Sequence, residues 1–101
     1  MKRLFADAFY WIALLHAGDQ WHQRVIAFTA VRRLLASSEV TVIHQTRELF
    51  LEGLTLYEAR PDKEYSLTDC ISMQTMRREG LTDVLTNDHH FTQEGFRILF
   101  A

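Results

Sequence analysis

The chain has 101 residues, of which 48% are hydrophobic and 24% charged, a composition typical of one folded globular domain rather than of a disordered segment. Its formal net charge of −2 at pH 7 excludes a global basic field, so a nucleic-acid role would have to rest on a local site. The single cysteine, Cys70, cannot form an internal disulfide, which fits a reducing compartment. We therefore expect a single domain over residues 1–101 and a cytoplasmic location.

The N-terminal residues resemble a signal peptide, because Met1-Lys2-Arg3 precede an apolar run that extends to Leu15. Asp7 lies in the middle of that run, where a charge is costly for a secretory segment. We interpret Leu4–Phe9 as a buried strand and Tyr10–His16 as a helical turn instead. No stretch of the sequence is long enough to span a membrane, so no membrane partner is expected.

Three segments have the apolar spacing and the flanking residues of helices. In Gln20–Ala36 the apolar residues recur at three- and four-residue spacing with arginines between them, which predicts an amphipathic helix. Thr46 is placed to cap a helix that runs to Ala59. Ser66-Leu67-Thr68-Asp69 has the S-x-x-D form of a capping box, and the helix that it starts is expected to end at Gly80.

Short strands are expected between and after these helices. Val40–His44 contains a β-branched run that predicts a strand. Asp83–Thr86 and Phe96–Phe100 are expected to be short strands, the second of them preceded by Gly95. The resulting order, β-α-β-α-α-β-β, predicts a three-layer α/β fold in which helices flank a short, mainly parallel sheet. The carboxyl ends of its parallel strands then lie at one edge.

Acidic residues follow the expected strands at the edge where open α/β sheets bind their ligands. Asp7 is at the end of the first strand, Asp88 lies just past Asp83–Thr86, and Asp69 is in the first turn of the helix between them. Converging carboxylates repel each other unless a cation lies between them, and Mg²⁺ and Mn²⁺ accept carboxylate and water oxygens. Such a site can activate a water and stabilise a phosphoryl transition state.

Each of these aspartates also has a structural interpretation. Asp69 fits the N3 position of a capping box with Ser66, and the pattern alone favours that role. Asp88 fits a turn former after a strand, which is again the better explanation of the residue taken in isolation. Asp7 is the strongest functional signal, because a carboxylate inside an apolar run is hard to explain as surface and needs a partner when buried.

Four motifs are similar to those of one known family. They are, in chain order, the strand and turn Leu4–Leu15, the D-x-x-H segment Asp19–His22, the S-x-x-D helix start Tyr65–Cys70 and the T-x-D-x-x-F…G-F ending Leu85–Phe96. The chain thereby resembles PIN domains, the metal-dependent ribonuclease modules of VapC-type toxins. The resemblance extends over residues 1–28 and 56–100, whereas residues 29–55 match only loosely.

The resemblance implies a function and a set of site residues. PIN domains are ribonucleases that use Mg²⁺ or Mn²⁺ held by acidic residues, and many are toxins that dimerise and are silenced by a cognate antitoxin. Carried over by position, Asp7, Asp69 and Asp88 would be the catalytic, metal-binding carboxylates, and Thr86 would support the site from the strand end. An RNA substrate, an antitoxin and a homodimer are thus expectations from the resemblance.

The chain also departs from the family. Ala8 and Phe9 follow the first aspartate, where the family commonly has serine or threonine. A strand and a glutamate-bearing helix that normally precede the strand resembled by Val40–His44 are missing, which leaves a sheet of about four strands. Glu48, in the first turn of the next helix, could take the place of that glutamate, and it is otherwise an acid favoured by the helix dipole. The alternative to a ribonuclease is therefore a catalytically impaired remnant that serves as a binding or oligomerisation module.

Histidines and arginines give weaker signals. His89-His90 has no Cys or His partner at zinc-ligand spacing, which argues against a zinc site. Arg32-Arg33 and Arg77-Arg78 are expected to be solvated helix faces and are also the best candidates for phosphate contacts. Cys70 is expected to be a small buried apolar residue.

Overall fold

The structure is a computed structural model that describes residues 3–6, 20–86 and 88–99, with the side chains of residues 20–23 and 27 also outside the description. Contacts divide the chain into two compact units, which we call unit 1 (Met1–Asp7 with Gln45–Ala101) and unit 2 (Ala8–His44). Each unit is described by itself, and the expectation of one domain over residues 1–101 stays a prediction. None of the helices in the described ranges is both long and apolar enough to cross a membrane.

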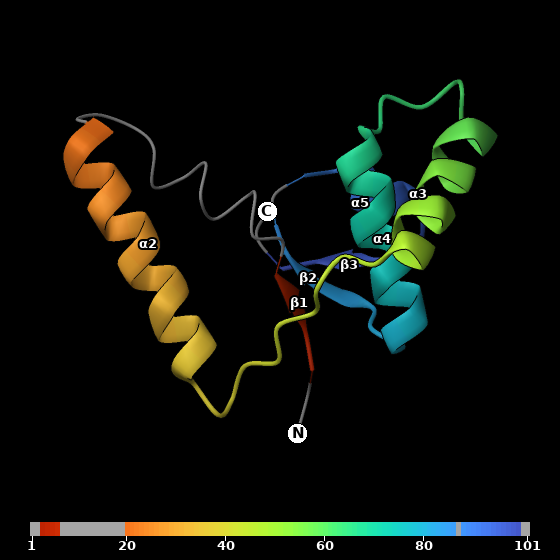
Figure 1. Cartoon of the computed structure of the whole chain (residues 1–101). Helices are drawn as coiled ribbons and strands as arrows, with labels where there is room; N and C mark the ends of the chain where they lie inside the picture. Colours follow the sequence, from red (N-terminus) through yellow and green to blue (C-terminus); the bar gives the residue numbers. More distant parts are fainter. Residues whose placement is uncertain (1–2, 7–19, 87, 100–101) are drawn as a thin grey trace. The chain divides into compact units, whose positions relative to one another are not determined.

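Three short strands form the sheet of unit 1 in the order β1-β2-β3 (Figure 1). β1 (Phe5–Ala6) pairs with β2 (Asp83–Leu85), β2 pairs with β3 (Arg97–Ile98), and both pairings are parallel. The register places Ala6 opposite Leu85. The prediction of an α/β chain with a parallel sheet is thus confirmed, and the strands carry their carboxyl ends to one edge.

Two long helices of unit 1 begin and end where local sequence signals predicted. In α3 (Arg47–Ala59) the Thr46 hydroxyl accepts a hydrogen bond from the Leu49 backbone N–H at 3.2 Å. α4 (Leu67–Glu79) ends at Gly80, whose φ of 68° lies in the left-handed region. A glycine takes this conformation without the steric cost that a Cβ atom would add, so the predicted C-terminal glycine is confirmed.

A close approach of α3 to α4 depends on Gly53. A Cβ atom at this position would lie 2.4 Å from Ile71 Cγ1 and 2.8 Å from Ile71 Cα, so a larger residue would push the helices apart. The Gln74 amide donates to the backbone carbonyl of Glu52 at 3.4 Å, and Arg78 forms an ion pair with the Glu52 carboxylate. The first half of α3 therefore lies beside the second half of α4, and the two helices run antiparallel (Figure 1).

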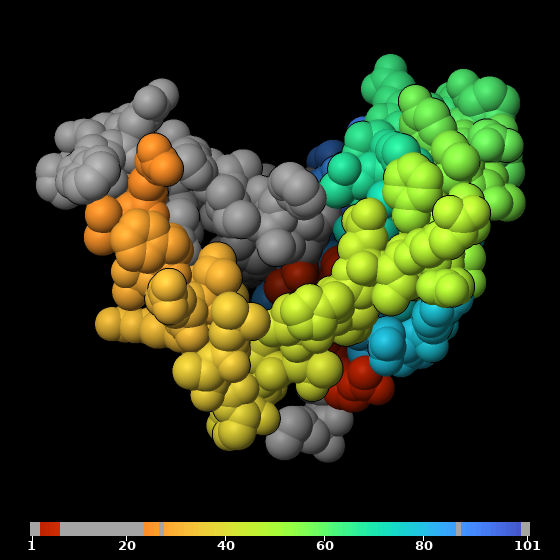
Figure 2. Space-filling view, viewed as in Figure 1, coloured from red at the N-terminus to blue at the C-terminus, as the bar shows by residue number. Residues whose placement is uncertain are grey.

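One face of α3 is buried and another is exposed. Leu49, Gly53 and Leu56 are buried. Phe50 and Tyr57 are 37% and 46% exposed, and α3 (yellow-green) lies at the surface in the space-filling view (Figure 2). Because the buried residues recur every three or four positions, a single helical stripe holds α3 on α4.

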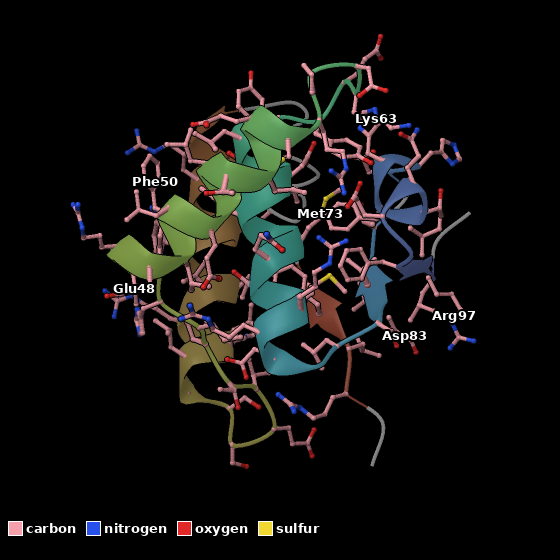
Figure 3. All side chains as sticks on the ribbon, turned by 90° about the vertical axis from the view of Figure 1, so that its right-hand side faces the viewer. Glu48, Phe50, Lys63, Met73, Asp83 and Arg97 are labelled. Atoms are coloured by element: carbon pink, nitrogen blue, oxygen red, sulfur yellow. The ribbon has the colours of Figure 1, made fainter. Side chains whose placement is uncertain are left out.

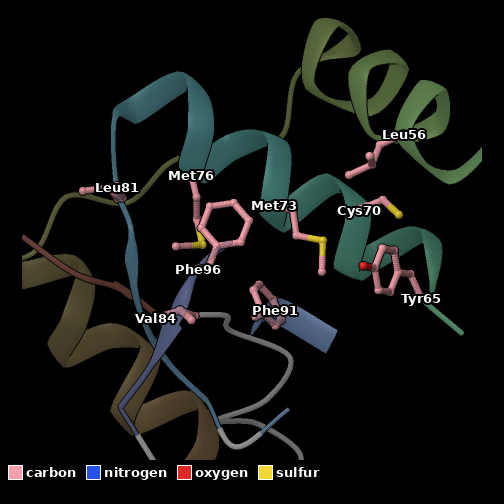
Figure 4. Packing of buried hydrophobic residues seen from close by; sticks show 9 residues of the cluster. All are labelled: Leu56, Tyr65, Cys70, Met73, Met76, Leu81, Val84, Phe91 and Phe96. Atoms are coloured by element: carbon pink, nitrogen blue, oxygen red, sulfur yellow. The ribbon is translucent and has the colours of Figure 1, made fainter. Parts of the chain in front are cut away.

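The hydrophobic core of unit 1 lies between α4 and the sheet (Figure 4). Met73 and Met76 of α4 and Val84 of β2 are fully buried, and burial of each such side chain stabilises the fold by about 1.5–3 kcal/mol. Cys70 is also fully buried, as predicted, and burial raises the pKa of its thiol. The whole cluster consists of Leu56, Tyr65, Cys70, Met73, Met76, Leu81, Val84, Phe91 and Phe96.

Unit 2 contains α2 (Gln20–Ala36), whose bounds agree with the predicted helix. The amphipathic pattern does not bury a face among its described side chains, since Val25, Phe28 and Leu35 are exposed. Residues 40–44 have no regular structure, so the strand predicted for Val40–His44 is wrong. Val40 and Val42 are 39% and 42% exposed. β-branched residues stabilise a strand only where a neighbouring strand and a packed face are present, and local propensity supplies neither. The described sheet has three strands rather than about four, and the PIN-like arrangement stays a prediction.

Candidate metal centre

The amino end of α4 positions Asp69. The Ser66 hydroxyl accepts a hydrogen bond from the Asp69 backbone N–H at 3.0 Å, and Asp69 Oδ2 accepts one from the Ser66 backbone N–H at 3.0 Å. This reciprocal pair is the predicted capping box. A carboxylate has about four lone-pair sites, so the capping role leaves Asp69 able to bind a further group.

The segment after β2 positions Asp88. Thr86 is only 2% exposed, and its hydroxyl accepts a hydrogen bond from the Asp88 backbone N–H at 3.1 Å. Asp88 Oδ1 in turn accepts one from the His90 backbone N–H at 2.9 Å, the Asx-turn role expected of a turn former. These bonds start the short helix α5 (His90–Gln93), which the sequence pattern did not predict.

The two aspartates and His90 converge on one point. One ligand atom from each of these three residues lies within 4.8 Å of the other two. His90 Nδ1 is 2.9 Å from Asp88 Oδ1 and 4.0 Å from Asp69 Oδ2. Nδ1 is shielded from solvent, yet it has no hydrogen-bond partner of normal geometry among the described residues. The approach of Nδ1 to Asp88 Oδ1 is therefore close but does not have the geometry of a hydrogen bond.

This donor set fits a divalent cation. Within the described ranges neither aspartate pairs with lysine or arginine, and the Asp69 and Asp88 side chains are 19% and 34% exposed, so solvent ions reach them. An ion between the carboxylates would also give His90 Nδ1 the partner that it lacks. Imidazole nitrogen suits transition metals, whereas Mg²⁺ prefers oxygen donors, so the set favours Mn²⁺ over Mg²⁺.

Another carboxylate, Glu94, lies just beyond α5 and is paired with two arginines. Its side chain is 4% exposed. Glu94 Oε2 accepts hydrogen bonds from Arg60 Nε at 2.9 Å and from the Tyr65 hydroxyl at 3.0 Å. Glu94 Oε1 accepts one from Arg77 Nη2 at 2.8 Å. We call these four residues the Glu94 network.

These contacts shift the pKa values of Glu94 and Tyr65. Burial by itself would raise the pKa of Glu94, but the hydrogen bonds from Arg60, Arg77 and Tyr65 outweigh it and lower that pKa to about 2. Burial, followed by the hydrogen bond to Glu94, raises the pKa of Tyr65 to about 12. The Tyr65 ring also lies edge-on to the His90 ring, with centroids 5.6 Å apart, so the network packs against the metal-binding candidate.

Of the two other predicted ligands, one lies outside the described residues and the other does not join Asp69, Asp88 and His90. Asp7 lies outside the described residues; in the sequence it follows Ala6, the last residue of β1. Glu48 is exposed in the first turn of α3 (Figure 3). Because α3 and α4 are antiparallel, Glu48 lies at the opposite end of the hairpin from Asp69.

Sequence patterns alone do not identify His90 or Glu94 as site residues. His90 has no Cys or His partner at zinc-ligand spacing in the sequence, whereas its neighbours in space are carboxylates. Glu94 had no local signal, because its partners Arg60 and Arg77 are 34 and 17 residues away. Arg77 lies on an exposed helix face as expected, but its charge is engaged by Glu94 and is less available to phosphate.

Comparison of the chain with protein-family models, with curated proteins and with solved structures finds no match in any of the three. The likeness to PIN domains therefore rests on the four motifs, and the metal-binding candidate rests on the geometry of Asp69, Asp88 and His90.

Proposed function

We propose that the chain is a metal-dependent endoribonuclease of PIN type. The observation that supports this function is the convergence of Asp69 and Asp88, two motif residues far apart in the sequence, on His90 with donor atoms within 4.8 Å. Asp88 follows β2 at the carboxyl edge of a parallel sheet, where α/β folds bind their ligands.

Each side chain has a role in this proposal. Asp69 and Asp88 hold the ion through carboxylate oxygens, His90 offers Nδ1, and Thr86 fixes the Asp88 backbone. When bound, Mn²⁺ or Mg²⁺ supplies an activated water and neutralises charge on the phosphodiester. Asp7 is the third proposed carboxylate, at the sequence position that follows β1. The antitoxin, the homodimer and the cytoplasmic location remain expectations from the resemblance.

A catalytically impaired binding module is the second candidate function. Asp69 Oδ2 and Asp88 Oδ1 each already accept a backbone hydrogen bond, so part of the donor set serves local structure. The cluster also contains only two carboxylates among the described residues, and Glu48 does not join it. A site of this kind can bind an ion without positioning a water for attack on phosphorus.

Cleavage of a mixed RNA pool separates the two candidates. The purified chain would be incubated with Mn²⁺, Mg²⁺ or EDTA, beside Asp88→Asn and a matched control, Glu58→Gln, which removes an exposed acid of α3. Cleavage that needs both the metal and Asp88, and that survives Glu58→Gln, would support the ribonuclease. A folded chain that binds Mn²⁺ and cleaves nothing would be the impaired module.

A further inference from the structure

A pocket of about 290 Å³ adjoins the metal-binding candidate and shares His90 with it. The pocket is open to solvent and its lining is polar, so it would hold a planar ligand at the surface rather than enclose it. The lining residues are Asp62, Lys63, Glu64, His90 and Gln93. In Figure 3, Lys63 lies in the loop that joins α3 to α4.

The loop that supplies three of these residues is held in place at both ends. The Lys63 backbone N–H donates to the Arg60 carbonyl at 3.1 Å, which closes a turn. Arg60 and Tyr65, which flank the loop, both donate to Glu94. The Glu94 network thus positions the pocket wall relative to α5, which carries His90 and Gln93.

The charges of the pocket suit a nucleobase better than a phosphate. Asp62 and Glu64 would repel a phosphate, whereas a carboxylate pairs with two adjacent N–H donors. The Watson–Crick edge of guanine offers such a pair, N1–H and N2–H, beside the O6 acceptor that a lysine ammonium fits. Adenine, cytosine and uracil lack two adjacent donors. His90 adds an imidazole ring, a group on which unpaired RNA bases stack.

We propose that this pocket binds a guanine base of single-stranded RNA next to the phosphate that reaches the Asp69–Asp88 cluster. Glu64 or Asp62 accepts from N1–H and N2–H, and Lys63 donates to O6. This inference rests on the proposed ribonuclease function, since it makes the pocket a subsite of that reaction, and it predicts cleavage beside guanosine.

Binding can be measured by fluorescence anisotropy in Ca²⁺, a cation that carboxylate oxygens also bind, with a gel after each titration to show that the probe is uncut. The probes are short labelled uridine-rich RNAs with one central guanosine, inosine, adenosine or cytidine, of which inosine lacks only the N2 amine. The guanosine RNA should bind about tenfold more tightly than the adenosine and cytidine RNAs, with inosine between them. Glu64→Gln or Asp62→Asn should remove that preference, Lys63→Met should weaken it, and Glu58→Gln should keep it.

The outcomes separate this inference from the proposed function. Equal binding of all four RNAs, no measurable binding, or a guanosine preference that survives every pocket variant would overturn the guanine subsite. Metal-dependent cleavage without preference for guanosine would also overturn it and leave the ribonuclease standing. Guanosine-selective binding with no cleavage in Mn²⁺ would instead overturn only the ribonuclease.

Discussion

Two acidic centres of unit 1, Glu94 and the Asp69–Asp88 pair, differ in what neutralises their charge. Glu94 is 4% exposed and accepts hydrogen bonds from two arginines and a tyrosine, so its charge is compensated within the fold. Asp69 and Asp88 are 19% and 34% exposed; within the described ranges they accept backbone hydrogen bonds and lie near the His90 imidazole, but they pair with no lysine or arginine. Removal of a carboxylate that is paired with cations leaves those cations uncompensated, whereas carboxylates without such cations are available to a metal ion.

Removing the Glu94 carboxylate should have the largest effect on stability. Glu94→Ala leaves Arg60, Arg77 and the Tyr65 hydroxyl without their shared acceptor and should lower the free energy of unfolding by about 3 kcal/mol. The arginines are 38% and 40% exposed, so water partly compensates them and a larger loss is not expected. Urea denaturation measures the change. Glu58→Ala, the control, should lower the free energy of unfolding by less than about 0.5 kcal/mol. Equal losses for Glu94→Ala and Glu58→Ala would contradict the difference between the two acidic centres.

Acid should weaken unit 1 through the same carboxylate. The pKa of Glu94 falls from an ordinary 4.5 to about 2 on folding, so its stabilisation is complete above pH 4.5 and is lost as the pH falls through 2. The shift corresponds to about 3 kcal/mol. Urea titrations across this window should show a steeper acid loss in the unaltered chain than in Glu94→Gln. Parallel curves for the two proteins would show that Glu94 does not carry the effect.

A metal ion bound at the Asp69–Asp88 centre should stabilise the folded chain. If it binds Mn²⁺, an ion concentration of about one hundred times Kd should raise the free energy of unfolding by about 2.7 kcal/mol. Asp88→Asn and Asp69→Asn should abolish this increment, and asparagine at position 69 still offers a side-chain oxygen to the cap. Thermal unfolding with Mn²⁺ or EDTA provides the measurement. If Mn²⁺ stabilises both variants as much as it stabilises the unaltered chain, the ion binds at another site.

His90 should set the preference of this centre among metals. His90→Ala removes the nitrogen donor and should weaken Mn²⁺ binding about tenfold, with a smaller effect on Mg²⁺, because Mg²⁺ prefers oxygen ligands. Calorimetric titration with each ion measures both affinities. An equal loss for the two ions would mean that His90 only positions Asp88.

Substitution of Glu48 should have the smallest effect on metal binding. Since it lies at the far end of the α3–α4 hairpin from Asp69, Glu48→Gln should leave the Mn²⁺ affinity within about twofold of the unaltered value. The same titration tests this. A loss comparable to that of Asp88→Asn would restore Glu48 as a substitute for the missing family glutamate.

Local sequence was sufficient to predict most of the helices and their ends. Thr46, Ser66 with Asp69, and Gly80 act within one turn of their own helix, so their hydrogen bonds and backbone angles follow from neighbouring residues. Both aspartates also have the local roles that their patterns predicted, a capping box for Asp69 and a turn for Asp88. The strand prediction for Val40–His44 failed because a strand needs a pairing partner that is distant in sequence.

The sequence by itself determined the α/β class, the helix boundaries and the positions of the candidate carboxylates along the chain. Only the tertiary structure decided which of them have cations beside them. Arg60 and Arg77 reach Glu94 across 34 and 17 residues, while Asp69 and Asp88 meet at His90 without an arginine among the described residues. The reason is physical: a helix cap is satisfied within a few residues, but the neutralisation of a charge depends on which distant segments the packed core brings together.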